Sequence, residues 1–286
     1  MIRSSRRDFL KTSSAAVAVA AAGASRINAA TLDMPIGLQL YTVREQLPKD
    51  FDGTLAKVRS AGYTVAEAAG YYGRTAVQFR QAMDKAGLRC VSTHHSMSEL
   101  NPHLDEVIAY DKALGVDYIV CPSPTRRNPA LRGKLDLEDW RWAAGQLNHI
   151  GEKVNAAGMR FGYHNHTPEF GQENGVVFYD ELLRLTDPKL VFFEMDCGWV
   201  IAAGRNPIDY LTKTPERFPL LHIKDIVRGP NGEFRSAVLG RGPTDYAPIL
   251  RAATGLKQYF VEQEEFDVDP FEAIRLDAEY MRKLNV

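Results

Sequence analysis

Beyond Ala30, short apolar runs rich in β-branched and aromatic residues alternate with longer stretches in which apolar positions recur every three or four residues. The short runs have the length and composition of buried strands, and the longer stretches have the period of amphipathic helices. The predicted strands are Ile36–Tyr41, Tyr63–Ala68, Leu88–His94, Asp117–Pro122, Met159–His166, Leu190–Asp196, Leu220–Asp225 and Gln258–Glu264. The predicted helices are Phe51–Ser60, Ala76–Lys85, Asp105–Leu114, Leu137–Ala156, Tyr179–Leu185, Pro207–Thr212, Tyr246–Ala253 and Pro270–Leu284.

Several predicted helices end in a glycine shortly before the next strand, as at Gly62, Gly87, Gly115 and Gly158. Glycine readily takes the left-handed conformation that closes a helix at its C-terminus. Strand and helix units repeated in this way predict an α/β fold, a single-domain (β/α)8 TIM barrel. An open doubly wound sheet is the alternative, but no GxGxxG follows the first strand. In addition, polar residues end strands all around the set, whereas an open sheet would concentrate them at one crevice.

Composition and charge narrow the classes of function. Of the 286 residues 45% are hydrophobic and 25% are charged, and the formal net charge is −1. These values are typical of a soluble globular domain and give no reason to expect a nucleic-acid partner. Cys90, Cys121 and Cys197 have the spacing of neither a zinc ribbon nor a CxxC redox site, so we interpret them as small buried residues. The sequence is compatible with a homodimer and does not decide the oligomeric state.

The N-terminal segment has the features of a transport signal. Basic residues precede an alanine-rich stretch, which is too short to span a bilayer and therefore predicts no permanent membrane anchor. The run from Ser5 to Lys11, with Arg6 and Arg7 near its start, resembles the twin-arginine export signal of bacteria. This resemblance implies a signal peptide over residues 1–30, a barrel over residues 31–286, the twin-arginine export machinery as a partner, and a periplasmic or otherwise exported location. A basic N-terminus without a targeting role is the alternative.

Polar side chains gather where the predicted strands end, which is the end at which TIM barrels build their active sites. They are Gln39 and Tyr41, Glu67, His94 and His95, His164 and His166, Glu194 and Asp196, His222 and Lys224, and Glu262 and Glu264. Because residues two apart on a strand share a face, both members of a pair such as His164 and His166 can point into the barrel.

Carboxylates at the inner ends of apolar strands must be neutralised, because a buried unpaired carboxylate is costly. A divalent cation can neutralise several of them together. We therefore predict Asp196, His222 and Glu262 as metal ligands. Mixed oxygen and imidazole donors favour Mn²⁺, with Mg²⁺, Co²⁺, Fe²⁺ and Zn²⁺ as alternatives. For each residue a structural role is the competing interpretation: a packed core histidine, a turn-capping aspartate and an arginine-paired glutamate.

The remaining polar and aromatic residues at the strand ends are candidates for contact with a small-molecule carbohydrate. Glu67 is equally consistent with a buried ion pair, Trp199 with core packing, and Arg241 with an ordinary Gly/Pro turn. The predicted substrate-binding residues are Gln39, Tyr41, Glu67, His95, Trp199 and Arg241.

Several motifs over the whole mature chain resemble the sugar phosphate isomerase/epimerase family of xylose isomerase-like TIM barrels. They are GLQLYTVRE (Gly37–Glu45), FGYHNHTPEF (Phe161–Phe170), MDCGW (Met195–Trp199), LHIKD (Leu221–Asp225), LGRGPTDY (Leu239–Tyr246) and FVEQEEF (Phe260–Phe266). The resemblance implies one divalent metal held by a Glu, an Asp, a His and a Glu on the fifth to eighth strands. The last three match Asp196, His222 and Glu262.

The fifth strand departs from this pattern, because His164 stands where many relatives have a glutamate. Glu169, a few residues further on, is our predicted replacement ligand, and ligation by His164 itself is the alternative. Relatives of the endonuclease IV type carry a histidine where this chain has Trp199, which argues against DNA repair.

The resemblance implies removal of a proton next to a carbonyl, with an enediolate stabilised by the metal. We predict His164, His166, Glu262 and Lys224 as the catalytic residues. The expected function is a metal-dependent isomerase or epimerase acting on a keto-sugar, polyol or glycoside. The alternatives are a lyase or dehydratase of the 3-keto-glycoside or inosose type, and a non-catalytic periplasmic sugar-binding protein.

Overall fold

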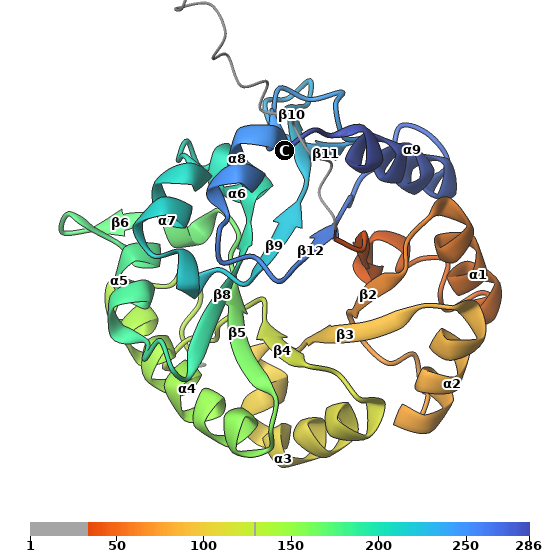
Figure 1. The fold of residues 1–286 in the computed structure, drawn as a ribbon. Helices are drawn as coiled ribbons and strands as arrows, with labels where there is room; N and C mark the ends of the chain where they lie inside the picture. The colour runs from red at the N-terminus through yellow and green to blue at the C-terminus, as the bar shows by residue number, and fades with distance from the viewer. Residues whose placement is uncertain (1–33, 129) are drawn as a thin grey trace, which may run out of the picture. The chain divides into compact units, whose positions relative to one another are not determined.

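The computed structural model describes residues 34–128 and 130–286, so the predicted signal over residues 1–30 lies outside the described residues. Eight parallel strands close into a barrel in the order β1-β12-β9-β8-β5-β4-β3-β2, with helices around the outside (Figure 1). The barrel strands are β1 (Gly37–Gln39), β2 (Val65–Ala68), β3 (Arg89–His94), β4 (Tyr118–Cys121), β5 (Arg160–His164), β8 (Val191–Asp196), β9 (Leu220–Ile223) and β12 (Gln258–Val261). The predicted (β/α)8 TIM barrel is confirmed.

Helices cover the barrel wall and follow the predicted pattern closely. Their bounds are α1 (Phe51–Ala61), α2 (Ala76–Ala86), α3 (Met97–Leu114), α4 (Leu137–Ala156), α5 (Phe178–Leu185), α6 (Cys197–Ala202), α7 (Pro207–Lys213), α8 (Tyr246–Ala252) and α9 (Pro270–Lys283). Helix α1 shows how the sequence sets these limits. The Asp50 side chain accepts the amide N–H of Gly53 at the N-terminus, and Gly62 ends the helix with a φ of 112°.

Two helices differ from the prediction. Helix α3 begins at Met97, ahead of the predicted start at Asp105, and it continues through Pro102 with a kink at His103. Pro102 is accommodated inside the helix by non-helical backbone at the next residue. Helix α6 was not predicted, and it begins directly after β8 because the Asp196 side chain accepts the amide N–H of Trp199.

The inside of the barrel is filled in layers. A small apolar cluster occupies the interior, with one residue from each of six strands: Val65, Val91, Val120, Phe192, Leu220 and Phe260. On β5, Gly162 faces this cluster, and a Cβ atom there would lie 2.3 Å from the Phe192 ring. Towards the carboxyl ends of the strands the inward residues become polar. We call this end the barrel mouth.

Short hairpins extend the chain beyond the barrel strands. One comprises β6 (Gln172–Glu173) and β7 (Val176–Val177), and the other β10 (Asp225–Arg228) and β11 (Phe234–Ala237). The loops also contain three single 3-10 turns in the described residues: η1 (Leu40–Val43), η2 (Pro168–Phe170) and η3 (Pro215–Arg217). The three cysteines are buried and free, as the sequence indicates. In the part of the chain that the structure describes, no helix has the length and apolarity needed to cross a membrane.

Candidate active site

Four metal-type donors meet at the barrel mouth. One donor atom from each of His164, Asp196, His222 and Glu262 lies within 4.8 Å of the others, and all four residues are buried. Strand register brings them together, because His164 of β5 pairs with Glu194 of β8, and Asp196 pairs with His222 of β9. We call these four residues the donor ring. It contains the three ligands predicted with most support from the strand pattern.

The fifth-strand position is occupied by His164 and not by Glu169, contrary to our expectation. Glu169 lies in η2, where its Oε1 accepts the hydroxyl of Tyr163 at 2.5 Å. Tyr163 points away from the barrel interior, because it is one residue from His164 and alternate residues of a strand face opposite sides. Glu169 is therefore anchored on the outer side of β5, outside the donor ring.

A second polar layer adjoins the donor ring and consists of Glu67, His94 and Glu194; His94 and Glu194 each also place one donor atom within 4.8 Å of His164 and His222. The Nε2 atom of His94 lies 2.9 Å from Glu67 Oε1 and 2.8 Å from Glu194 Oε2. Gln39 donates from Nε2 to Glu67 Oε1 at 2.7 Å. Burial by itself lowers the pKa of His94, but the two carboxylates outweigh burial and raise it to about 9. We call these three residues the deep layer.

His222 links the two layers. Its Nδ1 atom lies 3.0 Å from Glu262 Oε2 in the donor ring, and its Nε2 atom lies 2.8 Å from Glu67 Oε1 in the deep layer. A histidine that ligates a metal commonly donates its other ring N–H to a carboxylate, which fixes the tautomer and the ring orientation. Glu67 is placed to serve as that carboxylate.

Lys224 supplies a positive charge beside the donor ring. Its side chain is fully buried, and Nζ lies 3.1 Å from Asp196 Oδ2 and 2.9 Å from Glu262 Oε2. The same atom also pairs with Glu264. Burial lowers the pKa of Lys224, but the carboxylates outweigh it and raise the pKa above the ordinary lysine value. The ammonium group stays charged and neutralises part of the acidic cluster.

A divalent cation fits this donor set. Although it is fully buried, Asp196 Oδ2 makes no hydrogen bond of good geometry among the described residues, and Lys224 contacts it only as an ion pair. Burial raises the pKa of Asp196 even though Lys224 and His222 lower it. A buried oxygen with an unused acceptor position, next to two imidazoles and a second carboxylate, is the environment that a borderline divalent metal satisfies.

His166 is an uncharged imidazole at the mouth. It lines a cavity of about 420 Å³ together with Tyr41, His94, His164 and Glu262. Burial and the nearby Lys224 ammonium lower the pKa of His166 to about 4. Its imidazole is therefore neutral at neutral pH and free to accept a proton from a molecule bound in the mouth.

His95 does not face the mouth, contrary to the expectation that it contacts substrate. It is buried on the outer side of β3, with Nε2 2.7 Å from the Tyr71 hydroxyl and 3.3 Å from Asp111 Oδ2. His94 takes the inward position. The reason is a register shift where β2 pairs with β3, between Ala66 and Glu67. Such a bulge reverses which residues of the strand face inward.

The other predicted substrate residues are distributed around the mouth. Tyr41 lines the cavity and is 42% exposed, so its ring is accessible. Trp199 lies with its ring 4.8 Å from Lys224 Nζ. Arg241 is exposed in its loop. Gln39 and Glu67 are fully buried beside the donor ring, where Gln39 donates to Glu67 and Glu67 contacts His222. His94 and Glu194, which complete the deep layer, are absent from the predicted catalytic, substrate-binding and metal-binding residues. Glu194 could have been found from the sequence, because it shares its strand face with Asp196.

Residues 55–284 match the profile of the family described as "Xylose isomerase-like TIM barrel". The chain belongs to this family. Its relatives include the inosose dehydratase of Clostridium botulinum (strain Alaska E43 / Type E3), which is 24% identical over 267 residues, a match covering 82% of this chain and 89% of that protein.

Solved structures superpose on the barrel. A sugar phosphate isomerase/epimerase from Parabacteroides distasonis ATCC 8503 is 28% identical, with a TM-score of 0.74 over 90% of this chain and 97% of that one. A xylose isomerase-like TIM barrel protein from Mycobacterium smegmatis in complex with magnesium is 14% identical, with a TM-score of 0.66 over 88% of this chain and 96% of that one. The latter likeness establishes the shared fold. Membership of this enzyme family indicates that the chain is an enzyme.

Proposed function

We propose that the barrel mouth is the active site of a metal-dependent isomerase or epimerase that acts on a keto-sugar or keto-polyol. The observation that carries this proposal is the donor ring with neutral His166 beside it in one cavity. A group of cation ligands and an uncharged base in the same cavity suits removal of a proton next to a carbonyl. The family relatives that act on sugars and inososes support the choice of substrate class.

The donor ring would hold one divalent cation, with His164, Asp196, His222 and Glu262 as its ligands. Two imidazoles and two carboxylates favour Mn²⁺, with Mg²⁺, Co²⁺, Fe²⁺ and Zn²⁺ as the other candidates. The bound cation would act as a Lewis acid that polarises a carbonyl oxygen. The magnesium complex of the Mycobacterium smegmatis barrel supports a divalent ion in this fold.

Side chains of the protein would carry out proton transfer, stabilisation of negative charge and cation binding. His166 accepts the proton at a ring nitrogen, since its lowered pKa keeps it neutral. Lys224 keeps a permanent positive charge at the mouth, so it can stabilise an oxygen that becomes negative. Glu262 is held by Lys224 and His222, which assigns it to cation binding and leaves His166 as the base.

Elimination of a β-oxygen, as in a dehydratase or lyase, is the second candidate function. Two observations favour it. His164 stands on β5 where the family resemblance implies a glutamate, and an inosose dehydratase is among the relatives whose match covers 82% of this chain. A lone base such as His166 removes the first proton in either reaction. The two functions differ in whether that proton returns to carbon or a β-oxygen departs.

The test uses chelator-treated protein reloaded with Mn²⁺ and incubated in D₂O with a keto-inositol, fructose or xylulose. Isomerisation or epimerisation predicts deuterium next to the carbonyl by NMR, and elimination predicts an unsaturated ketone that absorbs in the ultraviolet. Asp196→Ala should lose both activity and stoichiometric metal. His166→Gln should retain metal but lose about 10²- to 10⁴-fold in kcat. Metal binding without any turnover would refute the enzyme and favour a sugar-binding protein.

We also propose that the protein is exported through the twin-arginine machinery. The run Ser5-Arg6-Arg7-Asp8-Phe9-Leu10-Lys11 supports this proposal. Replacing both Arg6 and Arg7 with lysine should leave the protein inside the cytoplasm of a bacterial host, whereas the unaltered chain should fractionate outside it. Equal distribution of the two forms would refute export by this route.

A further inference from the structure

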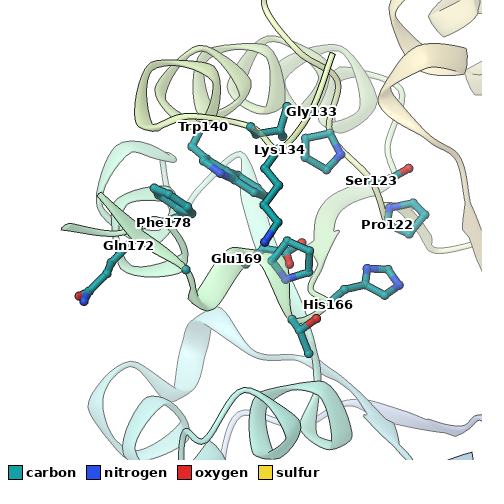
Figure 2. A pocket seen from close by; sticks show the side chains of 14 residues that line it. Pro122, Ser123, Gly133, Lys134, Trp140, His166, Glu169, Gln172 and Phe178 are labelled. Atoms are coloured by element: carbon teal, nitrogen blue, oxygen red, sulfur yellow. The ribbon is translucent and has the colours of Figure 1, made fainter. Parts of the chain in front are cut away.

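A second, larger cavity adjoins the mouth. It has a volume of about 840 Å³ and lies between α4, the loop that precedes it, and η2 (Figure 2). Pro122, Ser123 and His166 line both this cavity and the mouth. The two spaces therefore meet at the base proposed for proton removal. We call the second space the outer cavity.

The outer cavity combines aromatic surfaces with two opposite charges. Trp140 and Phe178 form one side, with ring centroids 5.6 Å apart and ring planes inclined by 17°. Leu135 adds a further apolar surface. Lys134 extends into the space on the side where Glu169 lies (Figure 2). Apolar faces beside a few polar groups are typical of sites that bind a ring bearing hydroxyl groups.

Two polar atoms of this lining lack a hydrogen-bond partner among the described residues. Trp140 Nε1 and Glu169 Oε2 are both buried, and neither makes a hydrogen bond of good geometry. The two side chains are each 2% exposed. Buried polar groups are normally paired, so the wall of this cavity retains one unused donor and one unused acceptor.

We propose that the outer cavity binds the second ring of a two-ring substrate, a glycoside whose reacting ring carries the keto group and lies in the mouth. This inference rests on the proposed function, and it narrows the substrate class. A mouth of about 420 Å³ is at the lower end of the range for ligand sites, and the outer cavity of about 840 Å³ is twice as large as the mouth. We expect the second ring to be uncharged. In the described lining of the outer cavity, Lys134 faces the carboxyl group of Glu169, which leaves no surplus of positive charge to bind a phosphate group.

Glu169 is the polar anchor for this ring. Burial raises the pKa of Glu169 to about 7, although the hydroxyl of Tyr163 and the backbone N–H of His166 lower it. Near neutral pH its carboxyl group is therefore present in both forms, and it can accept a hydrogen bond from a hydroxyl or donate one to a ring or glycosidic oxygen. The same placement explains why Glu169 is absent from the donor ring.

The experiment measures binding to the Mn²⁺-loaded protein by calorimetry and by the fluorescence of Trp140. The probes are glucose, cellobiose and phenyl β-glucoside, which differ in the second ring. We expect both two-ring probes to bind at least tenfold more tightly than glucose and to change the fluorescence. Trp140→Phe should abolish that change. A larger gain for cellobiose identifies a sugar as the second ring, and a larger gain for the phenyl glucoside identifies an aromatic aglycone.

Variants locate the second ring. Glu169→Leu and Lys134→Met should each weaken cellobiose binding about tenfold and leave glucose binding unchanged. Lys134 is exposed, so its variant is informative even if Glu169→Leu does not fold. Glu152→Gln, exposed on α4 and absent from both cavity linings, is the matched control.

Equal affinity for one and two rings, or cellobiose affinity insensitive to both variants, would overturn the inference. Turnover of single-ring ketoses could still succeed in that case, so the proposed function would stand. Tight cellobiose binding without turnover would instead remove the proposed function and keep the site.

Discussion

Replacing Lys224 with methionine tests the electrostatic account of the mouth directly. Methionine keeps much of the side-chain volume but removes the positive charge. In the cation-free protein this leaves Asp196 and Glu262 buried without the ammonium that lies 3.1 Å and 2.9 Å from them. The donor ring then depends on an added cation to offset its negative charge.

The magnitude follows from these distances. Each contact corresponds to on the order of 5 kcal/mol of Coulomb attraction at an effective dielectric constant of about 20. The cost of burying the charges offsets part of this, and removing one partner of a buried pair typically costs about 3 to 5 kcal/mol. For a chain of this size the melting temperature should fall by roughly 6 to 20 °C.

The assay is thermal unfolding of chelator-treated protein before and after titration with Mn²⁺. Because a positive neighbour has been removed, the Lys224→Met variant should bind Mn²⁺ at least about tenfold more tightly and recover most of the lost stability. Lys112→Met, at an exposed position of α3, should match the unaltered protein. A Lys224→Met protein with unchanged melting temperature, or with a smaller Mn²⁺ effect than the unaltered protein, would refute the reasoning.

Two further predictions concern buried carboxyl groups. Glu67→Gln removes the charge that orients His222, so Mn²⁺ affinity by calorimetry should fall about 10- to 100-fold, and an unchanged affinity would contradict this role. Burial raises the pKa of Asp277 to about 7, although the amide N–H of Leu239 lowers it. The folded protein therefore binds one more proton at this group than the unfolded chain does, and its stability falls as the pH rises from about 4 to 7. Asp277→Asn should therefore be more stable than the unaltered protein at pH 8, by up to about 4 kcal/mol, and equal to it near pH 4. Urea unfolding at both pH values measures this, and parallel pH profiles of the two proteins would count against it.

The sequence by itself determined the barrel and much of the donor ring. Apolar runs of strand length, alternating with amphipathic stretches, leave few architectures that bury both, and the closed barrel follows. Asp196, His222 and Glu262 could be recognised because each lies at or next to the carboxyl end of a regular apolar strand. Counting by two from the apolar residue in the barrel interior therefore gives the face to which each side chain points. Phe192, for instance, lies in the interior cluster, and Asp196 is four residues later on the same face.

The same counting fails on β3, where only the tertiary structure decides. Val91 belongs to the interior cluster, so strict alternation would place His95 inward. The register shift against β2 places His94 inward instead, and the histidine that reaches Glu67 and Glu194 is the one omitted from the predicted set. A bulge depends on pairing with the neighbouring strand, so one strand's sequence does not reveal it.

The fifth strand and the outer cavity depend on tertiary structure for a related reason. Strand alternation allowed His164 to face the mouth. Whether His164 or Glu169 supplies the fifth-strand donor depended on where the loop after β5 turns. The hydroxyl of Tyr163 holds Glu169 on the outer side of the barrel wall. There it meets Trp140 and Lys134, which are distant in sequence, and no local pattern joins them. Local periodicity fixes which residues face inward along a strand, whereas contacts between distant segments decide which loops complete a site.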